Sequence, residues 1–139
     1  MTSACSAEGG LFSTLLPVPK TLREAKGTCR VSRESPLVFH AHDPRVERSA
    51  RRWQGRCPVR PTARETPPAV RIAVDRTHET HPDGYRLTVL VDGMELLGGS
   101  PAGCFYGLQT LTQLTDFASG EVPCCVIDDF PDFTTRGLL

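Results

Sequence analysis

Apolar positions in residues 43–56 recur at the spacing of a helix. Apolar side chains separated by four, three and four residues form a single stripe: Val46, Ala50, Trp53 and Cys57. Asp43 can cap the first turn, and Pro44 suits the first helical position. The pattern predicts an amphipathic helix that begins after Asp43.

A second helix is predicted over residues 100–114, where Ser100 can cap and Pro101 can start the helix. Its apolar stripe has two small flanking residues: Phe105, Leu108, Leu111 and Leu114, flanked by Cys104 and Ala118. Gly103 and Gly107 lie four residues apart and cost about 1 kcal/mol each in a helix. We expect them to allow close approach of another backbone.

The remaining apolar runs have the spacing and composition of strands: residues 36–40, 69–74, 85–91 and 94–98. Residues 85–91 alternate and place four residues on one face: Tyr85, Leu87, Val89 and Val91. Asp92–Gly93 predicts a hairpin turn into 94–98. Residues 21–32 are predicted to form two short strands that turn near Lys26–Gly27.

Together these elements predict an α+β fold, in which two helices cover one face of a mostly antiparallel sheet. The other face, which carries Arg86, Thr88 and Leu90 of 85–91, is expected to be polar. We divide the chain into a disordered segment (1–14), one domain (15–127) and a linker leading into a further strand (128–139).

Composition excludes several classes of protein. The 139 residues are 39% hydrophobic and 23% charged, as expected for a globular domain. Lys and Arg (16) balance Asp and Glu (16), which indicates no nucleic-acid partner. No apolar run is long enough to span a membrane. The first 20 residues lack the pattern of a secretory signal, and we therefore expect a cytoplasmic protein by default.

Six cysteines are present: Cys5, Cys29, Cys57, Cys104, Cys124 and Cys125. Because nothing marks an exported chain, we expect reduced thiols that act as small core residues, with disulfides as the alternative. The chain has no C-x-x-C pair, and the histidine pairs His78/His81 and His40/His42 lack the spacing of zinc ligands. We expect neither a metal nor a cofactor.

Three further patterns resemble functional motifs, and each has a simpler structural interpretation. "GGSPAG" (98–103) lacks the lysine of a phosphate-binding loop and fits a turn into a helix. Arginines in 43–56 share a face that is typical of a solvated helix surface: Arg45, Arg48, Arg52 and Arg56. A carboxylate cluster, comprising Asp128, Asp129 and Asp132, fits a bend that leads into a strand.

A longer stretch carries a family resemblance. "GCFYGLQTLTQL", preceded by "GYRLTVLVDGMELLGGSPA" and followed by "VIDDFPDFTTRGLL", resembles the N-terminal accessory domain of family 20 glycoside hydrolases, the β-N-acetylhexosaminidases. "LLPVPK" (15–20) is similar to the family's usual N-terminal segment, whereas 20–68 match only in layout. Related domains also precede the barrels of α-glucuronidases and O-linked N-acetylglucosamine hydrolases, which stay open as alternatives.

The resemblance also implies roles for residues near the end of the sequence. "DFPDFTTRGLL" matches the family run D-x-P-x-F-x-x-R-G, which leads into the first strand of a catalytic (β/α)₈ barrel. Arg136 would then hydrogen-bond hydroxyls of the terminal sugar of an N-acetylhexosamine glycan. The family's catalytic Asp–Glu pair would lie in the barrel, and we therefore expect no catalytic residue in this chain.

Three origins of such a chain stay open: a fragment, a frameshifted gene, or a domain retained alone. The first two imply a non-catalytic part of a hydrolase. The third allows a stand-alone carbohydrate-binding or protein-interaction module that uses the open sheet face.

Overall fold

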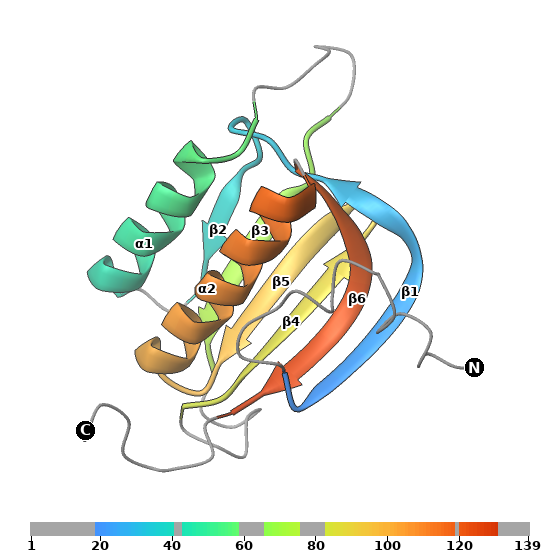
Figure 1. Cartoon of the computed structure of the whole chain (residues 1–139). Coiled ribbons are helices and arrows are strands. Elements are labelled where there is room, and N and C mark those ends of the chain that lie inside the picture. Colours follow the sequence, from blue (N-terminus) through green and yellow to red (C-terminus); the bar gives the residue numbers. More distant parts are fainter. Residues whose placement is uncertain (1–18, 41–42, 59–65, 76–82, 119, 131–139) are drawn as a thin grey trace.

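The structure, a computed structural model, describes residues 19–40, 43–58, 66–75, 83–118 and 120–130. Within them the elements in chain order are β1 (Thr21–Arg30), β2 (Leu37–Phe39), α1 (Pro44–Gly55), β3 (Ala69–Val74), β4 (Tyr85–Leu90), β5 (Gly93–Gly98), α2 (Pro101–Ala118) and β6 (Glu121–Asp129). Figure 1 shows them as one curved sheet with both helices on the same face.

The strands lie in the order β1-β6-β4-β5-β3-β2. The pairs β1–β6, β4–β6 and β4–β5 are antiparallel. The pairs β2–β3 and β3–β5 are parallel. The mostly antiparallel α+β fold is therefore confirmed, with a parallel part beneath α1 that the sequence did not indicate.

The predicted turn near Lys26–Gly27 is wrong. Residues 21–30 form a single strand, and both of its halves pair with β6, with a shift of register between Glu24 and Thr28. Gly27 has a φ of 99°, in the left-handed region that favours glycine. The glycine therefore allows an irregularity within one strand rather than a reversal of the chain.

The strand β6 contains residues that we expected in a bend. Asp128 and Asp129 are the last residues of this strand. Pro123, which cannot donate a ladder hydrogen bond, pairs with Thr28 beside the irregular part of β1. The strand therefore tolerates a proline because its neighbour is irregular at that point.

The helix α1 begins as predicted. Asp43 accepts hydrogen bonds from the backbone N–H groups of Arg45 (2.9 Å) and Val46 (3.3 Å), and Pro44 opens the helix. The hydrogen bond from the Arg45 side chain is the largest cause of a lowered pKa at the Asp43 carboxyl. The predicted apolar stripe is buried throughout: Val46, Ala50, Trp53 and Cys57.

The helix α2 packs across the centre of the sheet. Ser100 Oγ accepts from the backbone N–H of Gly103 at 3.3 Å, in agreement with the predicted cap. The fully buried face consists of Cys104, Leu108, Leu111 and Leu114. Phe105, which we placed in that stripe, is partly buried against the core. The side chain of Ala118 lies outside the described residues.

The two glycines of α2 permit the close approach that their spacing predicts. A Cβ on Gly103 would lie 2.2 Å from the backbone oxygen of Gly84, the residue before β4. A Cβ on Gly107 would lie 2.3 Å from a side-chain carbon of Leu96. A side chain at Gly103 would therefore displace the helix from the sheet, whereas one at Gly107 would require the Leu96 side chain to move.

Two buried hydrogen bonds fix how α2 sits. The Trp53 indole donates to Thr115 Oγ1 at 3.0 Å, which joins α1 to α2. The Tyr85 and Thr110 hydroxyls are 2.6 Å apart and join β4 to α2. Buried polar groups are stable only when they are paired, and both contacts meet that condition.

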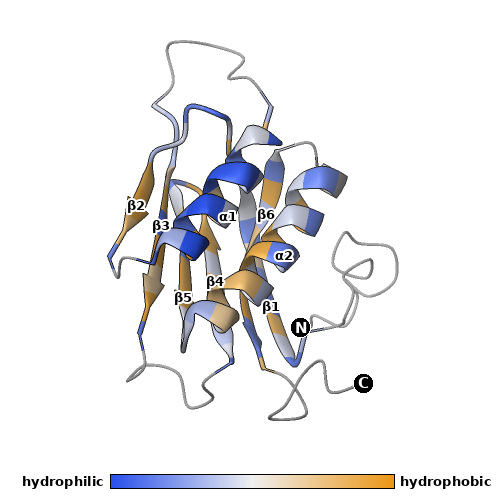
Figure 2. Cartoon of the chain, turned by 90° about the vertical axis from the view of Figure 1, so that its left-hand side faces the viewer, coloured by the Kyte–Doolittle hydropathy of each residue, from blue (hydrophilic) through white to orange (hydrophobic). Residues whose placement is uncertain are grey.

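The alternation in β4 separates its two faces. Tyr85, Leu87 and Val89 are buried beneath the helices. Val91, which we placed with them, is 64% exposed, because the hairpin turn is formed by Val91–Asp92 and Gly93 already pairs with Leu90. The β2 and β3 strands are mostly hydrophobic in Figure 2, and much of α1 is hydrophilic.

Several predictions concern residues outside the described ranges: the disordered segment 1–14, Cys5, His42, His78 and His81, and the further strand within 128–139 beyond Phe130. In the described part of the chain, neither helix is long and apolar enough to cross a membrane.

Candidate functional site

The predicted sugar-binding residue, Arg136, lies outside the described residues, as does Asp132. Asp128 and Asp129 are described, and both take part in structural contacts. Arg86 donates from Nε to Asp128 Oδ1 at 2.7 Å, across the β4–β6 pair. The backbone N–H of Lys20 donates to Asp129 Oδ1 at 3.1 Å.

These contacts hold the start of β1 beside the end of β6. The Thr21 hydroxyl donates to the backbone oxygen of Asp128 at 3.1 Å. The Lys20 ammonium lies 5.5 Å from the centroid of the Phe130 ring, within the range of a cation–π contact. The two aspartates therefore stabilise the part of the sheet where β1 begins and β6 ends.

The "GGSPAG" turn uses its glycines for packing. A Cβ on Gly98 would lie 2.6 Å from the backbone nitrogen of Cys104, and the Gly99 N–H donates to the oxygen of Gly84 at 2.9 Å. The tight contacts of Gly98 and Gly103 explain why small residues stand here. This favours the turn over a phosphate-binding loop.

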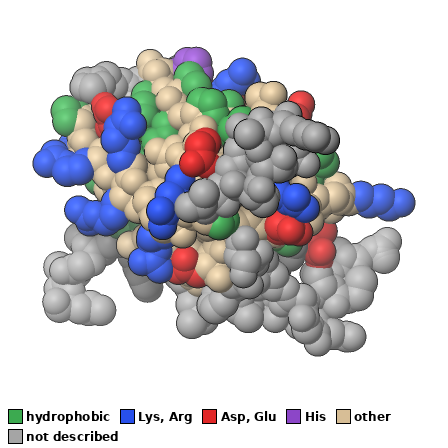
Figure 3. All heavy atoms as spheres, turned by 90° about the horizontal axis from the view of Figure 1, so that it is seen from above, with side chains coloured by type: hydrophobic (Ala, Val, Ile, Leu, Met, Phe, Trp, Pro, Cys, Tyr) green, Lys and Arg blue, Asp and Glu red, His purple; other side chains and the backbone are tan. Residues whose placement is uncertain are grey.

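The arginine face of α1 is solvated, as its spacing predicts. Lys and Arg side chains gather on the left of Figure 3, the side on which α1 lies in Figure 1. Two arginines of this face pair with nearby carboxylates: Arg45 with Asp43 (3.3 Å) and Arg56 with Asp116. Arg51, which lies outside the predicted face, pairs with Glu47 (3.0 Å). These exposed pairs reduce the positive charge that the face presents.

Five cysteines are described, and all five are buried and free. Burial raises the pKa of Cys29 and Cys125 to about 12, and that of Cys57 and Cys104 to about 11. Such thiols remain protonated near neutral pH and are poor nucleophiles. Among the described residues, no group of three or more His, Cys, Asp or Glu could hold a metal ion.

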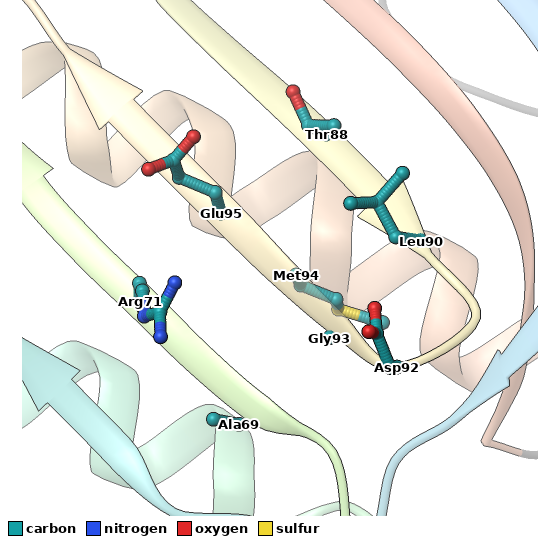
Figure 4. A pocket seen from close by; sticks show the side chains of 8 residues that line it. All are labelled: Ala69, Arg71, Thr88, Leu90, Asp92, Gly93, Met94 and Glu95. Carbon is teal, nitrogen blue, oxygen red and sulfur yellow. The ribbon is translucent and has the colours of Figure 1, made fainter.

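A hollow of about 210 Å³ lies on the open face of the sheet, opposite the helices (Figure 4). It is lined by residues of β3, β4, β5 and the turn between β4 and β5: Ala69, Arg71, Thr88, Leu90, Asp92, Gly93, Met94 and Glu95. In Figure 4, Arg71, Glu95 and Thr88 project from three adjacent strands on the side away from the helices.

The hollow exists because two small residues are register partners. Ala69 of β3 pairs with Gly93 of β5, and a Cβ on Gly93 would lie 3.0 Å from the Ala69 backbone oxygen. The next pair on this face consists of the long side chains of Arg71 and Glu95. The backbone of Ala69 and Gly93 therefore forms the floor of the hollow, and the charged side chains of Arg71 and Glu95 border it.

Sequence reasoning predicted a polar open face but did not find this hollow. Residues 69 and 93 are far apart in the sequence, and only the parallel β3–β5 pairing brings them together. No local pattern marks that pairing, because β5 forms its hairpin with β4 and pairs with β3 on its other side.

The described acidic and thiol groups have structural roles. The aspartates Asp128 and Asp129 stabilise strands, and the described thiols are buried. Residues 13–130 match the model for glycosyl hydrolase family 20, domain 2. The chain belongs to glycoside hydrolase family 20, and the match covers its second domain.

Individual relatives agree with this assignment. A β-hexosaminidase from Akkermansia muciniphila is 47% identical over 60 residues, which cover 41% of this chain and 12% of that protein. β-Hexosaminidase B from Pseudoalteromonas piscicida is 35% identical over 69 residues, which cover 50% of this chain and 9% of that protein. The structure of Flavobacterium johnsoniae chitobiase aligns with a TM-score of 0.65 and 26% identity, covering 89% of this chain and 22% of that one.

The matched segments therefore span about a tenth of the length of these curated relatives. Because the match is to family 20, an origin in an α-glucuronidase or an O-linked N-acetylglucosamine hydrolase is not favoured, and neither is a stand-alone module.

Proposed function

We propose that the chain is the accessory domain of a β-N-acetylhexosaminidase. The domain would lie beside a catalytic (β/α)₈ barrel in the same polypeptide, and the whole enzyme would act on N-acetylhexosamine glycans. The match of residues 13–130 to domain 2 of family 20 carries this proposal. A (β/α)₈ barrel takes about 250 residues, more than this sequence holds, and the relatives are many times longer than the matched segment.

The chemistry of the described residues supports a non-catalytic role for this domain and a catalytic role for the barrel. Glycoside cleavage needs an acid and a group that stabilises positive charge at the anomeric carbon, both held in a shielded cleft. Asp128 is bound by Arg86 and Asp129 by the Lys20 backbone, and both are the last residues of β6, which lies between β1 and β4. The acid and its partner carboxylate are therefore assigned to the barrel.

Arg136 is the residue of this chain that would reach substrate in the proposed enzyme. A guanidinium is a planar fork of donors and stays charged at all working pH values, which suits it to binding sugar hydroxyls rather than to proton transfer. The domain limits 15–127 and 128–139 belong to the same proposal. The contacts of Lys20 with Asp129 and Phe130 would fix the direction in which the chain leaves the sheet.

The coding DNA that follows codon 139 provides the direct test. The proposal expects a continuation, in the same frame or in a shifted one, that encodes strand–helix repeats of a barrel and an Asp–Glu pair. Unrelated downstream sequence, confirmed in an independent isolate of the gene, would contradict it.

A further inference from the structure

The polar groups around the hollow on the open sheet face are not used by the fold. Arg71 and Glu95 are exposed register partners, yet among the described residues no hydrogen bond or ion pair involves either side chain. On the same face, Arg86 is paired with Asp128. Because Arg71 and Glu95 face the same hollow without forming an ion pair with each other, their donors and acceptors are available to a ligand.

The shape of the hollow limits what can enter it. Its floor is the backbone of Ala69 and Gly93, and one wall is Leu90, whose side chain is 54% exposed. With a volume of about 210 Å³, the hollow is smaller than a typical drug-sized pocket of roughly 300–1,000 Å³. It suits one small ring that has an apolar patch and a polar edge.

The charged groups that line the hollow determine which polar groups a ligand must carry. The lining holds one guanidinium (Arg71), two carboxylates (Asp92 and Glu95) and one hydroxyl (Thr88). Carboxylates accept hydrogen bonds from hydroxyl or amide groups, and the guanidinium donates to a carbonyl oxygen. The excess of carboxylates disfavours anionic ligands such as phosphate or uronic acids.

We propose that this hollow is a second, non-catalytic sugar site, which binds a single neutral N-acetylhexosamine unit. Arg71 donates to the acetamido carbonyl oxygen, Glu95 and Asp92 accept from ring hydroxyls, and Leu90 packs against the acetamido methyl group. The choice of sugar rests on the proposed function, because it assumes that the parent enzyme acts on N-acetylhexosamine glycans. The hollow lies on the sheet face opposite the helices.

The test is a titration of the ¹⁵N-labelled 139-residue chain with N,N′-diacetylchitobiose, monitored by amide chemical shifts. A ligand of this size held by a few charged hydrogen bonds is expected to bind with Kd on the order of 1 mM. Shifts should concentrate at residues 69–71 and 90–95. Cellobiose, which lacks acetamido groups, should bind at least about tenfold more weakly.

Variants identify the groups responsible. Arg71→Gln and Glu95→Gln should each weaken binding about tenfold or more, because each removes a charged hydrogen-bonding group from an exposed position. Arg23→Gln, which changes an exposed arginine on β1, should leave the affinity unchanged. The unperturbed spectrum of each variant verifies its fold.

Three results would overturn the inference: no shifts at the hollow, equal shifts with cellobiose, or binding that survives both glutamine substitutions. None of them bears on the proposed function, which depends on the coding sequence of a barrel. Conversely, chitobiose binding without a downstream barrel would support the sugar site and remove the accessory-domain proposal.

Discussion

Replacing Gly103 with alanine tests the close packing of α2 on the sheet. A Cβ at this position would lie 2.2 Å from the backbone oxygen of Gly84 and 3.2 Å from its carbonyl carbon. The obstacle is backbone rather than a flexible side chain, and relief of the contact requires α2 or the start of β4 to move. A Cβ on Gly55, at the end of α1, would meet nothing within 4 Å, and this glycine therefore provides a matched control.

The expected magnitude follows from two opposing effects. Overpacking costs about 1–3 kcal/mol, and a contact with backbone places Gly103→Ala near the upper value. Alanine is favoured over glycine within a helix by about 1 kcal/mol, which leaves a net loss of about 2 kcal/mol. With an unfolding entropy of about 2.1 cal/mol/K per residue over 139 residues, this lowers Tm by about 7 °C.

Thermal unfolding followed by circular dichroism measures both variants. Gly103→Ala should unfold about 7 °C below the parent chain, whereas Gly55→Ala should unfold at the same temperature or slightly higher, because it gains helix propensity without a clash. If Gly103→Ala were as stable as Gly55→Ala, the close approach of α2 to Gly84 would be refuted.

Three further predictions concern buried and capping groups. Thr115→Val should destabilise the chain by about 1–3 kcal/mol in urea unfolding, because the buried Trp53 N–H loses its acceptor; an unchanged midpoint would contradict the contact. The described cysteines, Cys29 and Cys125 among them, should resist a thiol reagent at pH 8 until the chain unfolds, because their raised pKa keeps them protonated. The pKa of Asp43 is lowered on folding, so its stabilising contribution should be present above about pH 4 and be lost as the pH falls through the folded pKa; the pH dependence of Tm should weaken in Asp43→Asn.

The two helices were predicted well because their signals are local. Asp43 and Pro44 mark the start of α1 within adjacent residues, and the stripe from Val46 to Trp53 repeats at the helical period. The position of Gly103 also followed from sequence, because a glycine is costly inside a helix unless something packs against it.

The strands were predicted less completely because their neighbours are distant in sequence. The two halves of β1 belong to one strand since both pair with β6, about 100 residues later. The strand β6 itself was not predicted, because Pro123 and the adjacent Cys124 and Cys125 interrupt any alternating pattern.

The candidate sites show the same limit. The sequence pointed to the aspartates near the C-terminus, but their roles depend on Arg86 and Lys20, which pairing of distant strands brings to them. The hollow depends on the Ala69–Gly93 register between strands that are not consecutive. Sequence resemblance identified the family, whereas the location of a second polar site required the sheet order.

The most direct test of the accessory-domain account is turnover of a chromogenic N-acetylglucosaminide by two preparations that are free of host hexosaminidases. One is the purified 139-residue chain. The other is a chimera in which residues 13–130 replace the corresponding domain of the Akkermansia muciniphila β-hexosaminidase. The account predicts no turnover by the chain alone and turnover by the chimera. Turnover by the isolated chain that persists through purification and disappears in Asp129→Ala would contradict it.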